Sequence, residues 1–408
     1  MKKKLKRRLL IVGIVALALI VVAAIFLLNV NIRALSDISN ESYVTFDDIQ
    51  KINEQNMFGK FVETNLDKSQ VEVGGERPKV GKVIFKLFGL IPIKSVDVQI
   101  LDDENVYLGG NPVGFSIKTN GVIVVGKNSV LTENGLVSNC DNQNINSGDI
   151  ITHIDGIAIK DANDIPSHLK DVNGSVKLTL KRNAKSFDVT LNPIVDTNGN
   201  KKIGLWVRDD ATGIGTLTYV DSKTLDFGAL GHPVTDGETG TKIDIQKGQV
   251  YDCSVVGLEK GQRGKPGELK GVFLSSKNAK GEIEGGNDFG IYGKILEKSG
   301  IVDENVVAGV GGRLAVKPGK AQIMSSVSGV REYYDIEIIK ASKQKTAKDK
   351  SMVFRVTDKR LLELTGGIIQ GMSGSPILQN GKLVGAVTHV FVSDPTKGYG
   401  IYIDWMMV

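Results

Sequence analysis

The sequence has few of the residues on which metal and redox chemistry depend. Only two cysteines, Cys140 and Cys253, and only four histidines occur among its 408 residues. It contains no Cys-x-x-Cys pair and no cluster of histidine and cysteine, so the ligand spacing of a zinc site is missing. The sequence therefore predicts neither a metal nor another cofactor, and it favours two unpaired thiols over a disulfide.

A surplus of positive charge is missing from the body of the chain. The formal net charge is +5, but six lysine and arginine residues stand within residues 1–8, and without them the net charge is −1. Nucleic-acid binding depends on clustered basic residues that neutralise phosphates. We therefore predict no nucleic-acid partner for the body.

The N-terminus, by contrast, is typical of a membrane anchor. The basic segment 1–8 precedes an uninterrupted apolar run over residues 9–28, and a helix of this length spans the hydrocarbon core of about 30 Å. The positive-inside rule places the N-terminus in the cytoplasm and the body outside. A cleaved signal peptide is the alternative, but residues 27–31, Leu-Leu-Asn-Val-Asn, contain no small-residue cleavage site.

Short apolar runs separated by glycine-containing turns dominate the rest of the chain. This pattern predicts a mainly β protein of two or three domains. We expect a stalk and a small N-terminal region over 29–104, a PDZ-like domain over 105–195 and a polar linker over 196–202. Residues 203–408 are predicted to form a β-barrel or sandwich.

Two motifs favour the PDZ-like domain. Residues 112–115, Pro-Val-Gly-Phe, match the loop that binds a peptide carboxylate, so Val113, Gly114 and Phe115 are the candidate peptide-binding residues. Residues 147–156 are typical of a PDZ strand that ends at an Asp-Gly turn. Such a module adds a peptide as a strand to an open sheet edge. We expect it to bind a substrate, a regulator or a second copy, and a PDZ fold that acts only as a spacer is the alternative.

The most informative motif is Gly-Met-Ser-Gly-Ser-Pro at residues 371–376. Glycine tolerates positive φ and lets the backbone approach a substrate closely. The hydroxyl of Ser373 can therefore act as a nucleophile, while the amides of Gly371 and Ser373 form an oxyanion hole. Ser375 is the alternative nucleophile, and a hairpin turn without chemistry is the alternative interpretation.

A nucleophilic serine needs a general base, and His232 is the best placed of the four histidines. Gly231 and Pro233 flank it and restrict the local backbone, which suits a base held in one orientation. His389 follows the serine on a predicted strand, where we expect it to line the substrate cleft.

An aspartate behind the imidazole would fix its tautomer and stabilise the imidazolium. Asp358 is the candidate for this role and precedes Ser373 by fifteen residues. Asp236 and Asp244, which lie closer to His232 in sequence, are the alternatives.

The hexapeptide resembles the Gly-Asp-Ser-Gly-Gly-Pro signature of chymotrypsin-like serine peptidases, with Met372 and Ser375 as the departures. Residues 228–237, 365–376 and 385–405 further resemble the stage IV sporulation protein B family. This resemblance implies a chymotrypsin-like β-barrel peptidase domain over 203–408. Carried over residue by residue, it implies the triad His232, Asp358 and Ser373.

The same resemblance implies an extracytoplasmic serine endopeptidase of sporulation signalling. Such an enzyme is secreted into the space between the two membranes of the forespore and cleaves itself near its N-terminus. Its protein substrate lies in the neighbouring membrane and restrains an intramembrane protease, so that cleavage leads to activation of a late sigma factor. The alternatives are a non-catalytic PDZ interaction protein with a dead peptidase scaffold and a transacylase that uses the same triad.

Overall fold

The computed structural model describes residues 42–44, 62–67, 79–87, 89–100, 105–182, 185–273, 278–298, 300–313, 316–342, 344 and 346–407. Strands dominate these residues, so the prediction of a mainly β protein is confirmed. No described helix is long and apolar enough to cross a membrane, and the predicted anchor over 9–28 lies outside the described residues. The chain divides into two compact units, described separately below.

The first unit contains a four-stranded sheet in the order β1-β4-β3-β2. Its strands are β1 (Ser42–Val44), β2 (Val62–Asp67), β3 (Lys79–Leu87) and β4 (Ile91–Ile100). β1 runs parallel to β4, and the other pairs are antiparallel. Val83 and Phe85 of β3 and Val96 and Val98 of β4 are buried. These side chains alternate along each strand and therefore share one face of the sheet.

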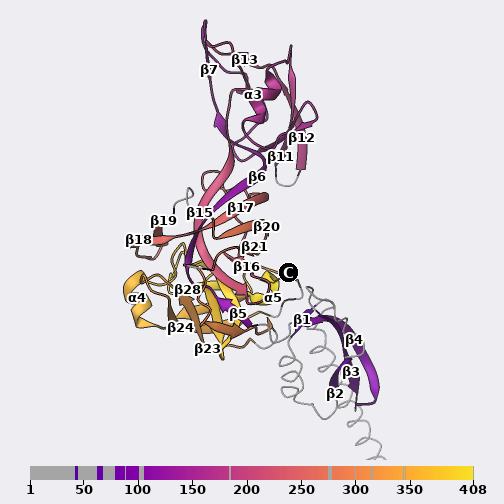
Figure 1. The fold of residues 1–408 in the computed structure, drawn as a ribbon, viewed down its shortest axis with the longest axis vertical. Helices are drawn as coiled ribbons and strands as arrows, with labels where there is room; N and C mark the ends of the chain where they lie inside the picture. The colour runs from indigo at the N-terminus through magenta and orange to yellow at the C-terminus, as the bar shows by residue number, and fades with distance from the viewer. Residues whose placement is uncertain are drawn as a thin grey trace, which may run out of the picture. The chain divides into compact units, whose positions relative to one another are not determined.

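The second unit contains two six-stranded barrels (Figure 1). The strands of the first barrel are β6 (Pro112–Lys127), β15 (Leu205–Asp221), β16 (Asp226–Ala229), β17 (Ile245–Asp252), β20 (Gly281–Asn287) and β21 (Gly290–Ile295). They pair in the order β6-β17-β20-β21-β16-β15, and the pairing of β15 with β6 closes the ring. Apolar side chains such as Phe115, Leu217, Phe227 and Ile291 fill its core. The short strands β5 (Asn105–Leu108) and β22 (Val307–Gly309) extend this sheet beyond β15.

The second barrel is closed in the order β23-β24-β25-β28-β27-β26. Its strands are β23 (Gly319–Ser325), β24 (Glu332–Ala341), β25 (Met352–Val356), β26 (Pro376–Gln379), β27 (Lys382–Val390) and β28 (Lys397–Tyr402). Helix α4 (Lys359–Thr365) follows β25, and helix α5 (Ile403–Met406) follows β28. When the six strands of each barrel are numbered along the chain, their order around the ring is first, second, third, sixth, fifth, fourth in both barrels. The two barrels therefore repeat one topology.

A PDZ-like module is inserted between the first two strands of the first barrel. It contains β7 (Val130–Thr132), β8 (Gly135–Val137), β9 (Ile150–Ile154), β10 (Ile157–Ala158), α3 (Asp164–Leu169), β11 (Val176–Arg182), β12 (Lys185–Leu191), β13 (Ile194–Val195) and β14 (Lys201–Lys202). β6 and β15 continue from the barrel into this module (Figure 1), and the module has an apolar core of its own. The predicted linker over 196–202 therefore lies near the C-terminal end of an insertion.

The prediction of a carboxylate-binding loop at residues 112–115 is wrong. Val113, Gly114 and Phe115 lie within β6, where one edge pairs with β15 and the other with β17. Val113 and Phe115 are buried in the barrel core. A Cβ atom on Gly114 would lie 2.1 Å from the Phe273 ring, so close packing accounts for the glycine. A strand paired on both edges cannot accept an added peptide strand.

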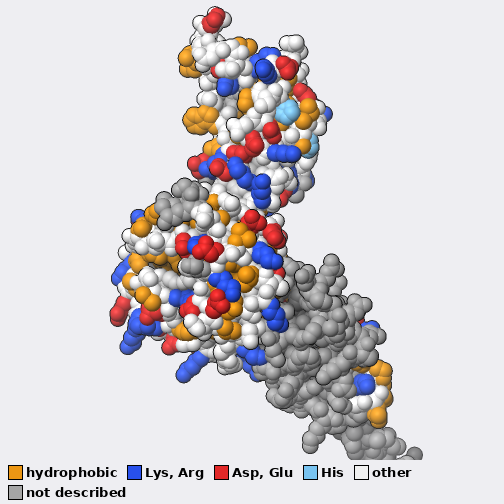
Figure 2. All heavy atoms as spheres, viewed as in Figure 1, with side chains coloured by type: hydrophobic (Ala, Val, Ile, Leu, Met, Phe, Trp, Pro, Cys, Tyr) orange, Lys and Arg blue, Asp and Glu red, His pale blue; other side chains and the backbone are white. Residues whose placement is uncertain are grey.

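A buried ion pair stabilises the PDZ-like module. Asp149 has a side chain only 1% exposed and accepts two hydrogen bonds from Arg182, at 2.6 and 2.7 Å. It also accepts one from the amide of Asn146, at 2.8 Å. On the face drawn in Figure 2, basic and acidic side chains are interspersed, and most other pairs lie at the surface. The Asp149 pair thus differs from its neighbours in being desolvated.

We expect Asp149→Ala to destabilise the PDZ-like module by about 3 kcal/mol, because the substitution removes the carboxylate that binds Arg182 and the Asn146 amide. Arg182 then keeps only its hydrogen bonds to Asn144, at 3.1 and 3.2 Å. Urea unfolding of the full chain in detergent, followed by hydrogen exchange in β9 and β11, measures this effect. Asp188→Ala is the matched control, because Asp188 forms an exposed pair with Lys177 at 3.3 Å, and exposed pairs contribute little. Equal loss of stability in the two variants would contradict the prediction.

Candidate active site

The predicted nucleophile lies in a sharp turn just before β26. Gly371 and Gly374 have φ values of +94° and +96°, a left-handed conformation that favours glycine. Ser373 lies between them, is half-buried, and donates a hydrogen bond from Oγ to the carbonyl of Thr388 at 2.8 Å. The turn therefore presents the hydroxyl of Ser373 toward β27.

The backbone amides of this turn form an alternating pattern. Met372 donates to Ile369 at 3.2 Å, and Gly374 donates to Val387 at 2.8 Å. Within the part of the chain that the structure describes, the amides of Gly371 and Ser373 make no hydrogen bond. Two unpaired donors on either side of Met372 are what a developing oxyanion requires. The two amides chosen from the sequence are thus the available ones, although their role stays a prediction.

Ser375, the alternative nucleophile, is fully buried. It has no exposed surface, and its Oγ has no hydrogen-bond partner in the described structure. A hydroxyl that no substrate can reach cannot attack a peptide bond. The structure therefore favours Ser373 over Ser375.

Strand β15 of the first barrel holds the nucleophile turn in place. The amide of Thr216 donates to the carbonyl of Ser373 at 3.0 Å. The hydroxyl of Thr216 donates to the carbonyl of Gly371 at 2.7 Å. The hydroxyl of Thr218 donates to the carbonyl of Gly374 at 2.8 Å. These three bonds fix the turn before β26 against the barrel that carries His232.

A hairpin of the first barrel borders the same turn. β18 (Ser254–Glu259) pairs with β19 (Glu268–Val272), and the Leu269 amide donates to the carbonyl of Gln370 at 2.8 Å. A Cβ atom on Gly371 would lie 2.8 Å from the Leu269 side chain. The hairpin therefore supports the residues that lead into the turn.

His232 follows β16 after a strained backbone segment. Leu230 and Gly231 have φ values of +73° and +74°. Leu230 is one of the few described non-glycine residues with a positive φ. Such strain costs about 1–3 kcal/mol and concentrates at functional sites. The Nδ1 atom of His232 lies 2.9 Å from the carbonyl of Pro233. A carbonyl only accepts, so Nδ1 carries the proton and Nε2 is left as the acceptor that a general base needs.

A second histidine packs against the first. The ring centroids of His232 and His389 are 5.2 Å apart with an interplanar angle of 42°. The Nδ1 atom of His389 lies 4.0 Å from Oδ2 of Asp349. Burial lowers the pKa of His232; burial and the neighbouring His232 lower the pKa of His389 to about 4. The charge of Asp349 opposes both shifts. Both rings are therefore neutral at pH 7.

Asp358, the predicted third member of the triad, does not lie beside His232. It is the N-cap of α4, where its carboxylate accepts hydrogen bonds from the Arg360 amide at 2.9 Å and the Asp335 amide at 3.3 Å. It also pairs with the Arg360 guanidinium at 3.0 Å. Burial raises the pKa of Asp358, but these bonds outweigh it and hold that pKa below its usual value.

Strand β25 separates the two aspartates. Asp349 precedes this strand and Asp358 follows it, and four residue steps in an extended strand cover about 13 Å. Asp236 and Asp244, the alternatives from the sequence, pair with Arg208 and Lys181 instead. The structure thus brings His232 and His389 together and places Asp349, which sequence reasoning missed, beside His389. Ser373 is bonded to Thr388, the residue that precedes His389.

The lowered pKa of His232 predicts how the site responds to pH. Burial lowers the pKa of His232 below its usual 6.5, so we expect reaction of Ser373 with a fluorophosphonate to slow only below that pH. Second-order labelling rates between pH 4 and pH 9 measure this. An acid limb centred above pH 6.5 would contradict the prediction.

Stability must be followed in parallel with these rates. The unfolded chain takes up a proton on His389 near pH 6.5, whereas the folded chain does so near pH 4. The contribution of neutral His389 to the free energy of unfolding is therefore fully present above pH 6.5, and it decreases as the pH falls toward 4. Tryptophan fluorescence at each pH separates loss of the fold from protonation of the base.

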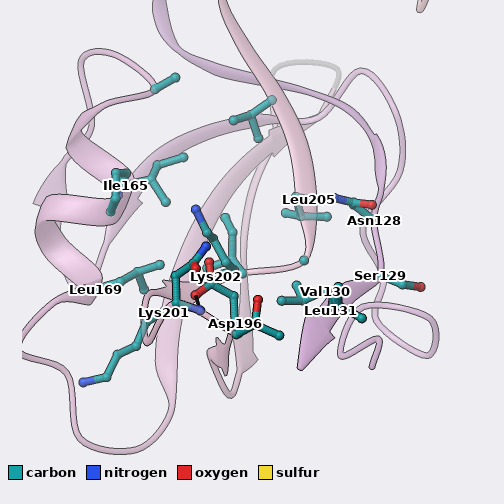
Figure 3. A pocket seen from close by; sticks show the side chains of 17 residues that line it. Asn128, Ser129, Val130, Leu131, Ile165, Leu169, Asp196, Lys201, Lys202 and Leu205 are labelled. Atoms are coloured by element: carbon teal, nitrogen blue, oxygen red, sulfur yellow. Dashed lines mark hydrogen bonds between the residues drawn. The ribbon is translucent and has the colours of Figure 1, made fainter. Parts of the chain in front are cut away.

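The PDZ-like module contains a cavity of about 480 Å³, away from the predicted loop. Figure 3 shows Ile165 and Leu169 of α3 on one side of it and Val130 and Leu131 of β7 on another. The ammonium group of Lys201 at its edge donates to the carbonyl of Lys170 at 3.0 Å. Apolar side chains thus line part of this cavity.

Metal ligands do not gather in the described residues, which hold no group of three His, Cys, Asp or Glu side chains suited to an ion. Cys140 and Cys253 are both free thiols.

Among known proteins, this chain is similar to a solved PDZ domain and to a peptidase family. A solved structure that matches is the PDZ domain of the SdrC-like protein from Listeria monocytogenes, which is 24% identical over 22% of this chain and 87% of that chain, with a TM-score of 0.18. No curated protein matches the sequence. The profile of the family described as SpoIVB peptidase S55 matches residues 199–407, which include His232, Asp349, Ser373 and His389. The chain therefore belongs to the SpoIVB peptidase S55 family.

Proposed function

We propose that this protein is a serine endopeptidase in which Ser373 is the nucleophile and His232 the general base. The observation that carries the proposal is the turn at residues 371–374. It presents one accessible serine hydroxyl, leaves two amides unpaired, and is held against the barrel that supplies a neutral histidine. Family membership supports peptide-bond hydrolysis as the reaction.

The reaction follows from these groups. Oγ of Ser373 leaves the carbonyl of Thr388 by rotation about χ1 and attacks the scissile carbonyl carbon, while Nε2 of His232 takes the hydroxyl proton. The amides of Gly371 and Ser373 donate to the oxyanion. The imidazolium then gives its proton to the departing amine, which leaves an acyl-enzyme. Water attacks the ester with His232 again as base, so the carboxylic acid and free Ser373 are formed.

The wider role extends this proposal. Two barrels of equal topology, with His232 following one strand and Ser373 preceding another, support a chymotrypsin-like peptidase domain. The apolar run at residues 9–28 supports a membrane anchor with the body outside the cytoplasm. The family description, SpoIVB peptidase S55, supports a role in sporulation. Within that role we propose a protein substrate in the neighbouring membrane, self-cleavage and activation of a late sigma factor. The PDZ-like module would bind that substrate, a regulator or a second copy.

A serine-directed probe tests the chemistry. The full chain in detergent is treated with a fluorophosphonate at pH 7.5, and the labelled peptide is identified by mass spectrometry. We expect the label on Ser373 and none after pretreatment at a denaturing pH.

The competing function is a non-catalytic interaction protein, and one observation favours it. The hydroxyl of Ser373 is bound to the carbonyl of Thr388 rather than to a histidine. Failure of the folded wild-type chain to react with the probe would support this alternative and would overturn the peptidase proposal.

A further inference from the structure

Residues 234–243 form a closed loop, the base loop, that directly follows the segment of His232. The amide of Ile243 donates to the carbonyl of Val234 at 2.9 Å, which closes the loop at its two ends. Ile243 is part of the core of the first barrel, and Val234 packs against that core. The carbonyl of Pro233, which lies 2.9 Å from Nδ1 of His232, is the last group before this loop. The conformation of the base loop therefore sets the carbonyl that orients the imidazole.

Asp236 organises the base loop from the inside. Its side chain is only 1% exposed. Its Oδ1 accepts hydrogen bonds from the amide and the hydroxyl of Thr239, both at 2.9 Å, and from the amide of Glu238 at 3.2 Å. Its Oδ2 pairs with the guanidinium of Arg208. Because a buried carboxylate that loses its cation is strongly destabilising, the conformation of the base loop depends on Arg208.

Arg208 lies where β15 passes from the first barrel into the PDZ-like module (Figure 1). It is paired with Ile123 of β6, and the other edge of β6 pairs there with β9 of the module. The pairing of β15 with β6 shifts register on both sides of Arg208, between residues 206 and 207 and between residues 208 and 210. The cation that supports the base loop thus comes from the connection between the barrel and the module.

The PDZ-like module touches the base loop but does not fill the space beside it. A Cβ atom on Gly148 would lie 2.2 Å from Oγ1 of Thr241, and Lys181 pairs with Asp244, just beyond the loop, at 3.1 Å. A cavity of about 590 Å³ is lined by residues of the module, Lys181 among them, and by residues 239–244. The base loop therefore borders a space into which it can move when its buried ion pair is lost.

We propose that Arg208 and Asp236 are positioning residues for the general base His232, an inference that rests on the proposed function. Their buried pair fixes the base loop, and the loop holds the Pro233 carbonyl. That carbonyl keeps the proton on Nδ1 and leaves Nε2 free to accept the proton of the nucleophile. The pair acts through the backbone of the loop and carries no proton itself. Because Arg208 belongs to the connection with the PDZ-like module, the position of the base depends on that connection.

Fluorophosphonate labelling of the full chain in detergent at pH 7.5 tests the effect on the base. We expect Arg208→Gln and Asp236→Asn each to slow labelling about tenfold, because a displaced base no longer lines up with the hydroxyl of Ser373. Arg208→Lys keeps a cation beside Asp236 and restores most of the rate. Since the two residues act as one pair, the double variant should be slowed no more than either single variant.

The tautomer of His232 gives a second readout, which does not require activity. In a chain labelled with ¹⁵N-histidine, the shifts of the ring nitrogens show whether Nδ1 or Nε2 carries the proton, and His232→Gln identifies the signals. We expect the Nδ1-protonated form in the wild type and in Arg208→Lys. In Arg208→Gln we expect a mixture of both forms, because a displaced loop no longer presents the Pro233 carbonyl to the ring.

Asp149→Ala is the matched control, because Asp149 is equally buried and pairs with Arg182 inside the module. Its unfolding temperature falls, but the labelling rate and the tautomer of His232 stay as in the wild type. Wild-type labelling and tautomer in Arg208→Gln would overturn the inference, and so would equal slowing of Arg208→Gln and Asp149→Ala. A wild-type chain that does not react with the probe, but whose tautomer changes in Arg208→Gln, would overturn the proposed function while supporting the positioning of His232 by the pair.

Discussion

Ser373→Ala is expected to reduce proteolysis of fluorescently labelled casein by about 10⁴-fold or more, because loss of the nucleophile of a serine–histidine pair leaves only residual catalysis from binding and the oxyanion hole. The substitution removes one hydrogen bond, from Oγ to the carbonyl of Thr388. Its effect on the fold is therefore small, and the unfolding temperature stays close to that of the wild type. Loss of activity without loss of the fold identifies a chemical role.

Ser375→Ala is the matched control for this experiment, two residues away in the same turn. Its hydroxyl is buried without a partner, and an unsatisfied buried hydroxyl lowers stability. We expect full activity and a free energy of unfolding that is unchanged or raised by up to about 1 kcal/mol. Retained activity in Ser373→Ala together with loss in Ser375→Ala would move the nucleophile and contradict the assignment of the oxyanion amides.

Local sequence signals predicted the backbone geometry of the turn because that geometry is local. Gly371 and Gly374 have the positive φ that the hexapeptide suggested, and the amides of Gly371 and Ser373 are unpaired as the motif required. The same holds for the strands, since alternating apolar residues report which face is buried. His232 was chosen because a nucleophile needs a base and few histidines exist, and its role as the base stays a prediction.

The closure of the first barrel could not be predicted in this way. β6 pairs with residues 205–216 and 245–252, about 100 residues further along the chain. A strand-like segment such as 112–119 has the same sequence pattern whether one edge or both edges of the strand are paired. The motif at 112–115 therefore indicated a PDZ loop, although long-range pairing places it in the barrel.

The two aspartates illustrate the same limit at the site. Asp349 stands in a lysine-rich stretch that looks like a solvated loop, and only the contact with Thr388 places it beside the histidines. Asp358 precedes a short helix, and an aspartate in that position is a typical N-cap. That signal was available in the sequence, and the catalytic role that the family resemblance implies for Asp358 stays a prediction.

Gly374→Ala is expected to remove activity and to destabilise the second unit by about 3 kcal/mol or more. An added Cβ would lie 2.1 Å from the carbonyl oxygen of Thr216 and 2.7 Å from the amide nitrogen of Leu230. Both atoms belong to backbone that cannot move without opening the contact between the two barrels. The positive φ of +96° adds a further cost of about 1 kcal/mol.

Gly381→Ala separates the clash from the backbone cost. Gly381 has a φ of +76° in the turn between β26 and β27, but a Cβ there meets no atom within 4 Å. The Gly381→Ala variant should lose only about 1 kcal/mol in its free energy of unfolding and keep its activity. Chemical denaturation and fluorophosphonate labelling of both variants give the comparison. Equal destabilisation would mean that the close approach of Gly374 to β15 is not what holds the nucleophile turn, whereas a selective loss in Gly374→Ala ties the activity of Ser373 to the packing of one barrel against the other.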